Sequence, residues 1–487
     1  MMAARDLTDA LPVLIPAAGG LWVLVVVSLL GDRNLRAPAL HALGILALSG
    51  AAALALLARE PRGAIFEGAV LLDAQALAFH LIFLMVAGLT VLASFNPLRE
   101  AGAGHGEFYA LILFAVSGMT MMAGSENLLS LFLGLEVLSI SLYVLAGFTR
   151  DRAYSVEGAL KYFLLGAFST GFVLYGIALF YGATGRIDLR GIASRLSAAR
   201  GGPADPLIVA GAALLLIGLG FKVAAVPFHF WAPDVYQGSM GQVAGFMATG
   251  TKAAAFAALL RVLTVGLGEE SIRNQWIGLL SVIAILTMIV GNVVALAQQN
   301  IKRMLAYSSI ANAGYLLVAV VAGGRAGNGT ATVFFYLAAY AFMTVGAFAV
   351  ATLLGSAGEE DEGYSLSAFA GLSRRRPYLA AAMAIFMLSL TGIPPTGGFM
   401  GKFYIFKSAV DAGMYGLAAV GLLASVVGAF YYLRVVVQMY LREPAGHAPP
   451  LLVGRAEALA ILIAALGTLW IGLFPSGLLA FAQHLGS

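Results

Sequence analysis

Long apolar stretches recur along nearly the whole chain, and they constrain its fold more than any other feature. A helix needs about 20 mostly apolar residues to cross a bilayer, where it satisfies its own backbone hydrogen bonds. The sequence therefore predicts an all-α integral membrane protein with about 14 transmembrane helices. The stretches lie at roughly 11–30, 38–58, 72–95, 107–124, 126–149, 156–183, 207–237, 243–265, 275–297, 302–322, 329–355, 378–412, 415–441 and 454–480.

Composition supports this class of protein. Hydrophobic residues make up 61% of the 487 residues and charged residues only 11%, against about 25% in a soluble domain. The absence of cysteine excludes disulfides, cysteine-held iron–sulfur clusters and thiol chemistry. A net charge of +4 and the lack of a phosphate-binding glycine loop argue against nucleic-acid and nucleotide partners. The early acidic residues of MMAARDLTDALP favour a retained first span over a cleaved signal peptide.

One apolar stretch is interrupted by charged and helix-breaking residues. Residues 218–237 read GLGFKVAAVPFHFWAPDVYQ and place Lys222 at membrane depth, shortly before Pro227 and His229. Proline removes a backbone donor and breaks the helix, and such a break is tolerated in a bilayer only where it faces protein or water. The pattern predicts a wet, polar interior. The alternative is a proline kink whose lysine snorkels to the headgroups.

A second interrupted stretch, LSLTGIPPTGGFMGKFYIF at 388–406, again combines proline, glycine and lysine. The two breaks fall in predicted helices 7 and 12, and an offset of five helices reverses the direction of crossing. Helices 4–8 and 9–13 are thus predicted to be inverted repeats, as in many transporters, although a shared function could produce the same similarity without duplication. The corresponding division is 1–105 for three N-terminal helices, 106–268 for the first repeat and half-channel, 269–445 for the second repeat and half-channel, and 446–487 for the C-terminal helix.

The chain keeps its few lysines within or at the edges of the apolar stretches, whereas most arginines lie in apparent connections. Arginine stays charged, but a buried lysine can lose its proton near neutral pH. The pattern indicates that the membrane interior carries lysine, the basic residue that can lose its charge there, rather than arginine. The six lysines are Lys161, Lys222, Lys252, Lys302, Lys402 and Lys407.

Several ionisable residues are predicted to lie near the middle of the membrane. Glu136 stands about ten residues into its span, Lys252 is similarly deep among small residues, and Lys402 follows the second break. Together with Lys222 they cost over ~10 kcal/mol, at ~2.5–3.5 kcal/mol each on insertion scales. A purely structural scaffold would not retain them, and a series of titratable groups across a bundle is typical of proton transfer.

The remaining ionisable residues have alternative explanations. Lys161 lies near a helix end, where snorkelling competes with a functional role. Lys302 fits an anchor at the membrane surface, and His80 fits a hydrogen-bonded packing residue. His229, beside the first break, is predicted to be functional. Arg434 is expected to pair with an acidic group that the sequence does not identify.

A Glu136–Lys222 pair is the predicted loading site for the proton. Moving one charge against ~150 mV costs ~3.5 kcal/mol, at ~2.3 kcal/mol per 100 mV. A carboxylate that moves toward or away from a buried lysine changes the proton affinity of that lysine by a comparable amount. Alternate closing and opening of the pair is therefore predicted to load and eject a proton.

Three motifs give the chain a family resemblance: FKVAAVPFHFWAPDVYQGS, IKRMLAYSSIANAGY and LTGIPPTGGFMGKFYIF. They resemble signatures of the antiporter-like membrane subunits of complex I, the respiratory NADH:quinone oxidoreductase. GLEVLSISLYVLAGF with ALKYFLLGAFSTGFVLYGIALFYGATG resembles the N-type members in particular. The resemblance covers roughly residues 70–445.

This resemblance implies a proton-pumping subunit with no cofactor of its own, because FMN, the iron–sulfur clusters and quinone are bound by other subunits. Its implied partners are the lipid bilayer and the other membrane subunits of the complex. One departure is the sequence GSMGQ after the first break, where the family often has a proline. The implied proton-transfer residues are Glu136 and Lys222 of the first half-channel, Lys161 as modulator, Lys252 as central relay, Lys402 of the second half-channel, and His229.

The resemblance places the chain in a bacterial inner membrane. A weak excess of basic residues in the loops on one side favours both termini on the periplasmic side. The alternative function is a subunit of an Mrp-type cation/proton antiporter. Sodium requires an oxygen-rich site, whereas the midplane positions are mostly lysines, which cannot coordinate a cation.

Overall fold

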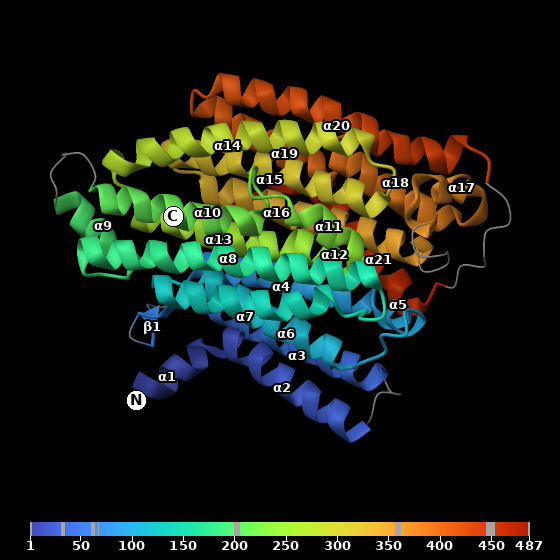
Figure 1. The fold of residues 1–487 in the computed structure, drawn as a ribbon, viewed down its shortest axis with the longest axis horizontal. Helices are drawn as coiled ribbons and strands as arrows, with labels where there is room; N and C mark the ends of the chain where they lie inside the picture. The colour runs from blue at the N-terminus through green and yellow to red at the C-terminus, as the bar shows by residue number, and fades with distance from the viewer. Residues whose placement is uncertain are drawn as a thin grey trace.

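The computed structural model describes residues 2–30, 35–59, 64–66, 68–198, 205–355, 362–444 and 453–485. Nearly all of them are helical, which confirms the all-α class. Two short strands, β1 (Ala64–Ile65) and β2 (Val70–Leu71), pair antiparallel ahead of α4 (Ala74–Leu92). Figure 1 shows the long helices lying side by side along the longest axis of the molecule, as expected for a membrane bundle.

Each of the predicted apolar stretches forms one helix, a pair of helices or, at 243–265, a continuous run of α-helical and π-helical segments. Two shorter apolar helices, α6 (Glu107–Ala123) and α18 (Pro377–Thr391), complete the set of spans. Within the described residues, the 12 segments long and apolar enough to cross a membrane are α2 (Leu11–Leu30), α3 (Arg36–Leu57), α4 (Ala74–Leu92), α7 (Leu128–Ala146), α8 (Ala153–Thr184), α10 (Pro206–Val223), Gly241–Gly266, α14 (Glu270–Ala297), α15 (Ile301–Ala326), α16 (Gly329–Gly355), α20 (Tyr415–Leu441) and α21 (Arg455–Leu473).

Short helices connect or extend these spans. The last predicted stretch is divided at Pro475, because the residue before a proline is disfavoured in the α conformation. The short elements are α1 (Met2–Asp9), α5 (Phe95–Glu100), α9 (Leu189–Ala198), α11 (Trp231–Gly238), α17 (Leu372–Arg375), α19 (Gly397–Asp411), α22 (Pro475–His484) and the 3₁₀ turns η3 (Glu362–Tyr364) and η4 (Leu366–Phe369).

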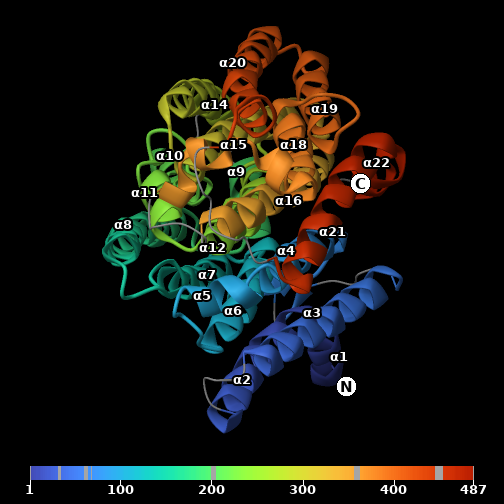
Figure 2. The same ribbon diagram turned by 90° about the vertical axis from the view of Figure 1, so that its right-hand side faces the viewer.

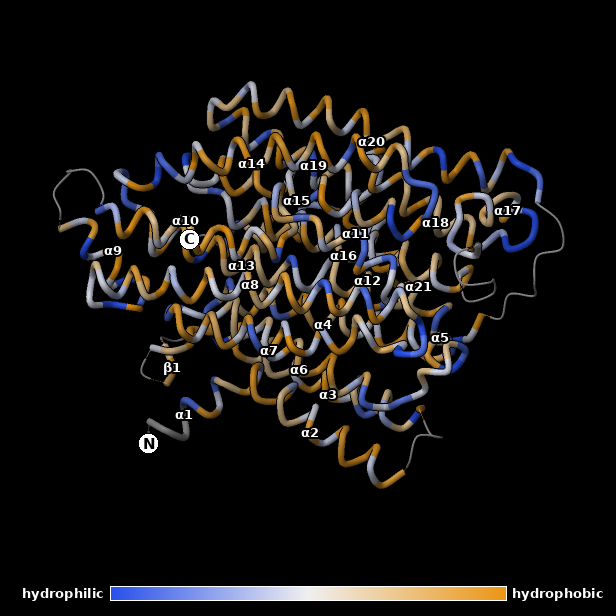
Figure 3. The backbone as a smooth tube through the Cα atoms, in the orientation of Figure 1, coloured by the Kyte–Doolittle hydropathy of each residue, from blue (hydrophilic) through white to orange (hydrophobic). Residues whose placement is uncertain are grey.

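The centre of the bundle is formed by helices that are apolar on every side. In the most apolar 18-residue stretch of each helix, all residues of Gly241–Gly266 and 94% of those of α15 and α16 are buried, against 22% in α3. Figure 2 looks along the bundle and places α12 (Gly241–Phe246) and α16 near its middle, with α2, α8 and α20 at the periphery. Figure 3 shows apolar residues along the helices and polar residues mainly near their ends. The outer helices therefore present apolar side chains as a lipid-exposed surface would.

The central segment contains two π-helical turns that the sequence analysis did not predict. It consists of α12 (Gly241–Phe246), η1 (Met247–Thr251), α13 (Lys252–Arg261) and η2 (Val262–Gly266). Lys252 directly follows the first π-helical turn. Such turns are rare and are frequent at functional sites.

Both predicted helix breaks are present. After α10 ends at Val223, Ala224 adopts a left-handed conformation with φ +58°, and after α18 ends at Thr391, Gly392 does so with φ +91°. The chain then restarts as α11 and α19. The left-handed conformation at Ala224 costs of order 1 kcal/mol or more because alanine has a Cβ. Surrounding contacts must hold this strained position in place.

Two equivalent caps relate the first half of the bundle to the second. Asn127 caps α7 and forms an isolated β-bridge with Asp188, just after α8. Asn300 caps α15 and forms the same kind of bridge with Ser365, after α16. The segments that follow, α9 and α17, lie at opposite ends of the bundle in Figure 1. This arrangement favours inverted repeats, and the division at residues 268 and 269 stays a prediction.

Candidate functional site

Lys222 lies one residue before the end of α10 and is 1% exposed. Its Nζ has no hydrogen-bond partner among the described residues. It lies 5.2 Å from the ring centroid of Tyr162 and 5.5 Å from that of Tyr143. Aromatic faces attract a cation, but they do not supply a proton acceptor. The lysine therefore occupies an aromatic pocket in which its charge is weakly compensated.

Helix α11 forms one wall of this pocket. Trp231, its first residue, stacks on Tyr162 with ring centroids 4.6 Å apart and donates from Nε1 to the carbonyl of Phe221 over 3.0 Å. The break is also held from α14, because Thr287 Oγ1 accepts from the backbone N–H of Val226 over 3.0 Å. These contacts satisfy backbone groups that the break frees from the helix.

Glu136 on α7 is the electrostatic partner of Lys222. One carboxylate oxygen, Oε1, is buried without a hydrogen-bond partner among the described residues, and no ion pair joins it to the lysine there. The two residues of the predicted pair thus lie close enough to interact electrostatically, but they do not form an ion pair. That the pair opens and closes stays a prediction.

Lys161 is held away from this pocket. Its Nζ forms ion pairs with Glu157 over 2.8 Å and with Asp234 over 2.7 Å, and its side chain is 43% exposed. Asp234 also pairs with Arg303 of α15 over 2.7 Å. Lys161 thus belongs to a charge cluster that joins α8, α11 and α15, and it reaches the pocket only through its neighbour Tyr162.

His229 lies in the unwound segment between α10 and α11. It is 7% exposed, and its ring is 4.5 Å from that of Phe230, centroid to centroid. Its Nδ1 is buried and has no partner among the described residues. The side chain can therefore accept or donate one further hydrogen bond inside the break.

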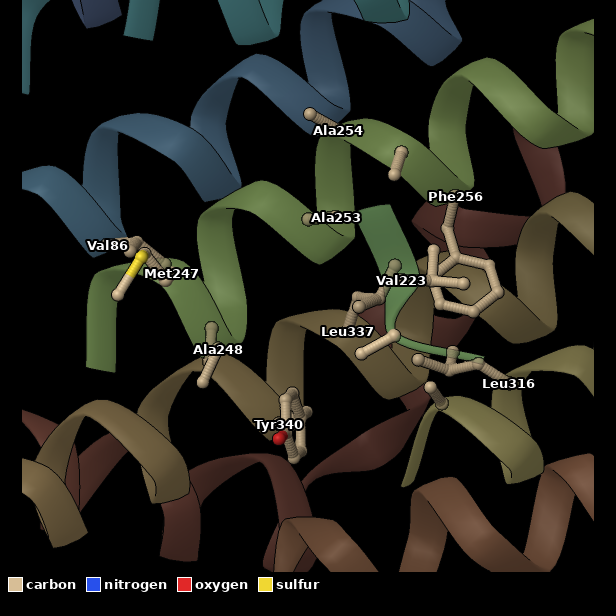
Figure 4. Close-up of a cluster of buried hydrophobic side chains, with 14 of the residues drawn as sticks. Val86, Val223, Met247, Ala248, Ala253, Ala254, Phe256, Leu316, Leu337 and Tyr340 are labelled. Atoms are coloured by element: carbon tan, nitrogen blue, oxygen red, sulfur yellow. The ribbon is translucent and has the colours of Figure 1, made fainter. Parts of the chain in front are cut away.

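Lys252 is buried at the centre of the bundle, with 1% exposure. Its Nζ donates to the backbone carbonyl of Ser309 on α15. Val223, the residue after Lys222, belongs to an apolar cluster with Phe256, Leu316 and Leu337, which Figure 4 shows between the neighbouring helices. Apolar side chains thus pack between the first break and α13.

Lys402 on α19 has a different environment. Its Nζ donates to the carbonyls of Leu390 and Thr391 over 2.8 and 3.1 Å, and to Ser425 Oγ over 2.8 Å. The ring centroid of Tyr315 lies 5.1 Å away. The three donor positions of the ammonium are therefore matched by three acceptors.

A network of neutral polar side chains, which the sequence analysis missed, lies between Lys252 and Lys402. It links α14, α15, α16 and α20. Asn292 donates to Tyr315 over 3.1 Å and accepts from Tyr431 over 3.0 Å. Asn312 accepts from Tyr336, and Ser308 pairs with Tyr432. Two sequence features could have indicated this network: the spacing of Ser308 and Asn312 in YSSIANAGY and the adjacent tyrosines Tyr431 and Tyr432.

The other ionisable residues play structural roles. His80 bonds Thr120 over 2.7 Å and Ser49 over 2.9 Å, which confirms it as a satisfied packing residue. Arg434 donates to the carbonyls of Leu296 and Gln298 at the end of α14, and within the described residues it pairs with these carbonyls and not with the acidic group that was expected. Helix C-terminal carbonyls carry the partial negative charge that binds it.

Lys302 was also predicted incorrectly. It is 5% exposed rather than a surface anchor, and its Nζ donates to the carbonyl of Ser239 over 3.0 Å and lies 4.0 Å from the ring centroid of Tyr364. By contrast, Lys407 is an exposed residue that pairs with Asp411 on its own helix over 2.5 Å. Burial of Lys302 arises because η3 folds back over the start of α15.

The fold and the site together define a multi-pass helical transporter of the antiporter-like type, built on two broken helices and buried lysines. Residues 125–428 match the family model described as NADH:quinone oxidoreductase/Mrp antiporter, transmembrane. A relative from Trichlorobacter lovleyi named NADH-quinone oxidoreductase subunit N is 49% identical over 419 residues, or 86% of this chain and 85% of the relative. The chain belongs to this family, among its NADH-quinone oxidoreductase N subunits.

Solved structures show the same fold. A chain of respiratory complex I from Thermus thermophilus is 38% identical, with a TM-score of 0.81, and the match covers 96% of this chain and 98% of that one. A chain of the Mrp complex from Dietzia superposes with a TM-score of 0.84 at 21% identity, covering 99% and 97%. The second likeness concerns the fold alone.

Proposed function

We propose that this chain is the proton-translocating membrane subunit of a respiratory NADH:quinone oxidoreductase in a bacterial inner membrane. The observation that carries the proposal is the series of buried lysines Lys222, Lys252 and Lys402, each at a break or a π-helical turn, in a chain of this family. A charge at such depth is costly and marks ion pathways.

Proton loading begins at Glu136 and Lys222. When the carboxylate approaches, the ammonium form of the lysine is stabilised; when it withdraws, the aromatic pocket of Tyr143 and Tyr162 leaves the charge weakly compensated and the proton is released. The separated arrangement of the pair supports this cycle. The strained left-handed Ala224, two residues after the lysine, makes the end of α10 a suitable hinge.

Transfer then continues through Lys252 to Lys402. Hydroxyl and amide side chains of the network around Asn292 and Asn312 span the interval between the two lysines. Lys402 holds the proton through its three acceptors until the second half-channel opens. His229 transfers protons within the first break, and Lys161 modulates Lys222 through its charge cluster at Asp234.

Electron transfer from NADH to quinone takes place in other subunits, which hold FMN, the iron–sulfur clusters and quinone, and it drives the cycle in this chain. Its partners are the other membrane subunits of the complex and the lipid bilayer. The basic residues of the loops favour both termini on the periplasmic side. The five-helix units 106–268 and 269–445 form the two half-channels, and the paired caps at Asn127 and Asn300 support this division.

The test is NADH-driven proton pumping in membrane vesicles that carry Lys222→Ala in the assembled complex. We expect pumping and quinone-linked turnover to fall while NADH oxidation by an artificial acceptor persists. Lys407→Ala, which removes an exposed lysine, is the matched control and keeps all activities. Unchanged pumping in the Lys222 variant would contradict the proposal.

The second candidate function is an Mrp-type cation/proton antiporter subunit, because the matching family model covers both NADH:quinone oxidoreductases and Mrp antiporters. Two observations separate the candidates. Co-purification with hydrophilic redox subunits supports the oxidoreductase, and sodium-dependent transport without an electron donor supports the antiporter.

A further inference from the structure

A large groove opens at the end of the bundle where α14 begins and α15 ends. Its volume is about 740 Å³, which lies in the range of sites that hold small molecules in proteins. Each helix that lines the groove begins or ends there, so the groove lies where the spans reach the membrane surface. The lining includes Gln75, Arg273, Trp276, Arg325, Thr330 and Leu485.

Two arginines of the groove carry unpaired charges. Arg273 is half-buried near the start of α14, and Arg325 is exposed in the last turn of α15. Neither guanidinium group forms an ion pair or a hydrogen bond within the described residues, although Glu270 stands only three residues before Arg273. Arginine presents a planar fork of N–H donors that matches a carboxylate or a phosphate. Both groups are therefore free to hold an anion.

The acidic residue of the lining does not neutralise these arginines, because it is bound elsewhere. Asp73 Oδ1 accepts from Arg261 over 2.7 Å and from the backbone N–H of Ala76 over 2.9 Å. Arg261 is 3% exposed, so this ion pair is internal and holds the central segment to the start of α4. The charge that remains in the groove is positive.

Neutral donors line the same groove. Gln75 Nε2 is buried and has no hydrogen-bond partner among the described residues. Gly329 and Thr330 are the first two residues of α16, and the first N–H groups of a helix have no partner within it. They also carry partial positive charge, which attracts anions. The groove thus combines two free guanidinium groups, an amide and a helix N-terminus, a set of donors that suits a phosphate group.

The apolar part of the lining favours a lipid over a soluble anion. Trp276 lies in the groove with 3% exposure, together with Leu263 and Leu485. Tryptophan is enriched at the level of the lipid headgroups, and basic pockets between transmembrane helices bind anionic headgroups. Inorganic phosphate would leave most of the groove empty, whereas a phospholipid has a polar and an apolar part to match the two parts of the lining.

We propose that this groove binds the headgroup of an anionic phospholipid. Arg273 and Arg325 hold its phosphate, and Trp276 and Leu485 contact the start of its acyl chains. The bound lipid joins α22, the last helix of the chain, to α14, α15 and α16. It takes no part in moving the proton, so the site is additional to the proposed function.

Photoaffinity labelling of the intact complex tests the site. The complex is placed in phosphatidylcholine vesicles that contain phosphatidylglycerol with a photoreactive group at the start of an acyl chain, and labelled peptides are identified by mass spectrometry. We expect the peptides with Trp276 and Leu485 to be labelled at least about fivefold more than by photoreactive phosphatidylcholine, because one basic residue near an anionic lipid contributes about that factor. Equal labelling by both lipids would overturn the proposal. So would unlabelled peptides, which would show that another subunit covers the groove.

The double variant Arg273→Gln, Arg325→Gln tests the contact with the phosphate. We expect labelling by phosphatidylglycerol to fall at least about fivefold, while labelling by phosphatidylcholine stays the same. Arg195→Gln is the matched control, because Arg195 is an exposed arginine of α9, which packs on η2 beside the groove, and does not line it. Equal labelling in the double variant and the control would show that the arginines hold no lipid.

Free glycerol phosphate in excess separates a bound lipid from a soluble anion. Labelling that persists supports the lipid, whereas complete loss of labelling shows a site for a soluble phosphate and contradicts the proposal. NADH oxidation by the artificial acceptor confirms that each variant is assembled. Labelling needs no proton pumping, so its result is independent of the outcome in Lys222→Ala.

Discussion

The two broken helices hold their lysines in opposite ways. Lys222 precedes its break, points into aromatic rings and has no hydrogen-bond partner among the described residues. Lys402 follows its break and folds back onto the carbonyls at the end of α18, with Ser425 as a third acceptor. In the first break, the carbonyl of Phe221 near the end of α10 accepts a hydrogen bond from Trp231.

The comparison shows that a similar sequence pattern, a helix break with a lysine nearby, can place the lysine among aromatic rings or among hydrogen-bond acceptors. A helix C-terminus carries partial negative charge, so the carbonyls at the end of α18 supply Lys402 with fixed acceptors. Lys222 has no such acceptor, and Glu136 forms no ion pair with it among the described residues. We interpret Lys222 as the site where the proton changes hands and Lys402 as the site that retains it.

The largest expected effect comes from Lys222→Arg, which is compared with the single variant Lys402→Arg. Arginine stays charged, and the aromatic pocket offers it no acceptor, so Lys222→Arg should lose pumping at least about tenfold, roughly 1.4 kcal/mol. Lys402→Arg should retain a measurable share, because fixed acceptors suit a guanidinium. Pumping in vesicles, normalised to assembled complex, measures both. Equal loss of pumping in the two variants would show that the different surroundings of Lys222 and Lys402 do not give them different roles.

Glu136→Gln should have the next largest effect. It removes the charge that favours the ammonium of Lys222, and a partly buried interaction at an effective dielectric of about 20 is worth a few kcal/mol at most. We expect pumping to fall about fivefold or more, with NADH oxidation by an artificial acceptor unchanged. Glu157→Gln, on the exposed cluster around Lys161, is the control. A greater loss in the control would contradict the assigned roles.

Ser425→Ala should have a moderate effect on the second site. It removes one of three acceptors of Lys402, and a hydrogen bond to a charged group contributes about 1.5–3 kcal/mol. Because two carbonyls remain, we expect a two- to fivefold slower turnover. Ser281→Ala, whose hydroxyl bonds its own helix at Ile277, provides the comparison in α14. Identical rates in the two variants would show that the third acceptor is dispensable.

Lys161→Gln should have the smallest effect. Its ion pairs are 43% exposed on the lysine side, and exposed pairs contribute about 0–1 kcal/mol. Arg303 still holds Asp234 in the variant, so α11 keeps its position. We expect less than a threefold change in pumping at normal assembly, measured beside Lys407→Gln. Complete loss would place Lys161 on the proton path itself.

The sequence predicted the spans and both breaks because lipid imposes strong rules on them. Apolar length identified the helices, and Pro227 and the Pro394–Pro395 pair located the breaks. The same reasoning could not find the π-helical turn before Lys252, since π-helical turns have no simple sequence period. It also mistook Lys302 for a surface residue, because the fold of η3 over it depends on distant contacts.

The sequence by itself determined which residues are costly to bury. Placing a charged lysine inside a bilayer has a high free-energy cost, whatever residues surround it in the sequence. Only the tertiary structure decided how each charge is compensated. Lys222 faces rings from α7 and α8, Lys252 meets a carbonyl of α15, and Lys402 meets the end of α18. Compensation depends on distances between residues far apart in the chain, and those distances are set by helix packing rather than by local sequence.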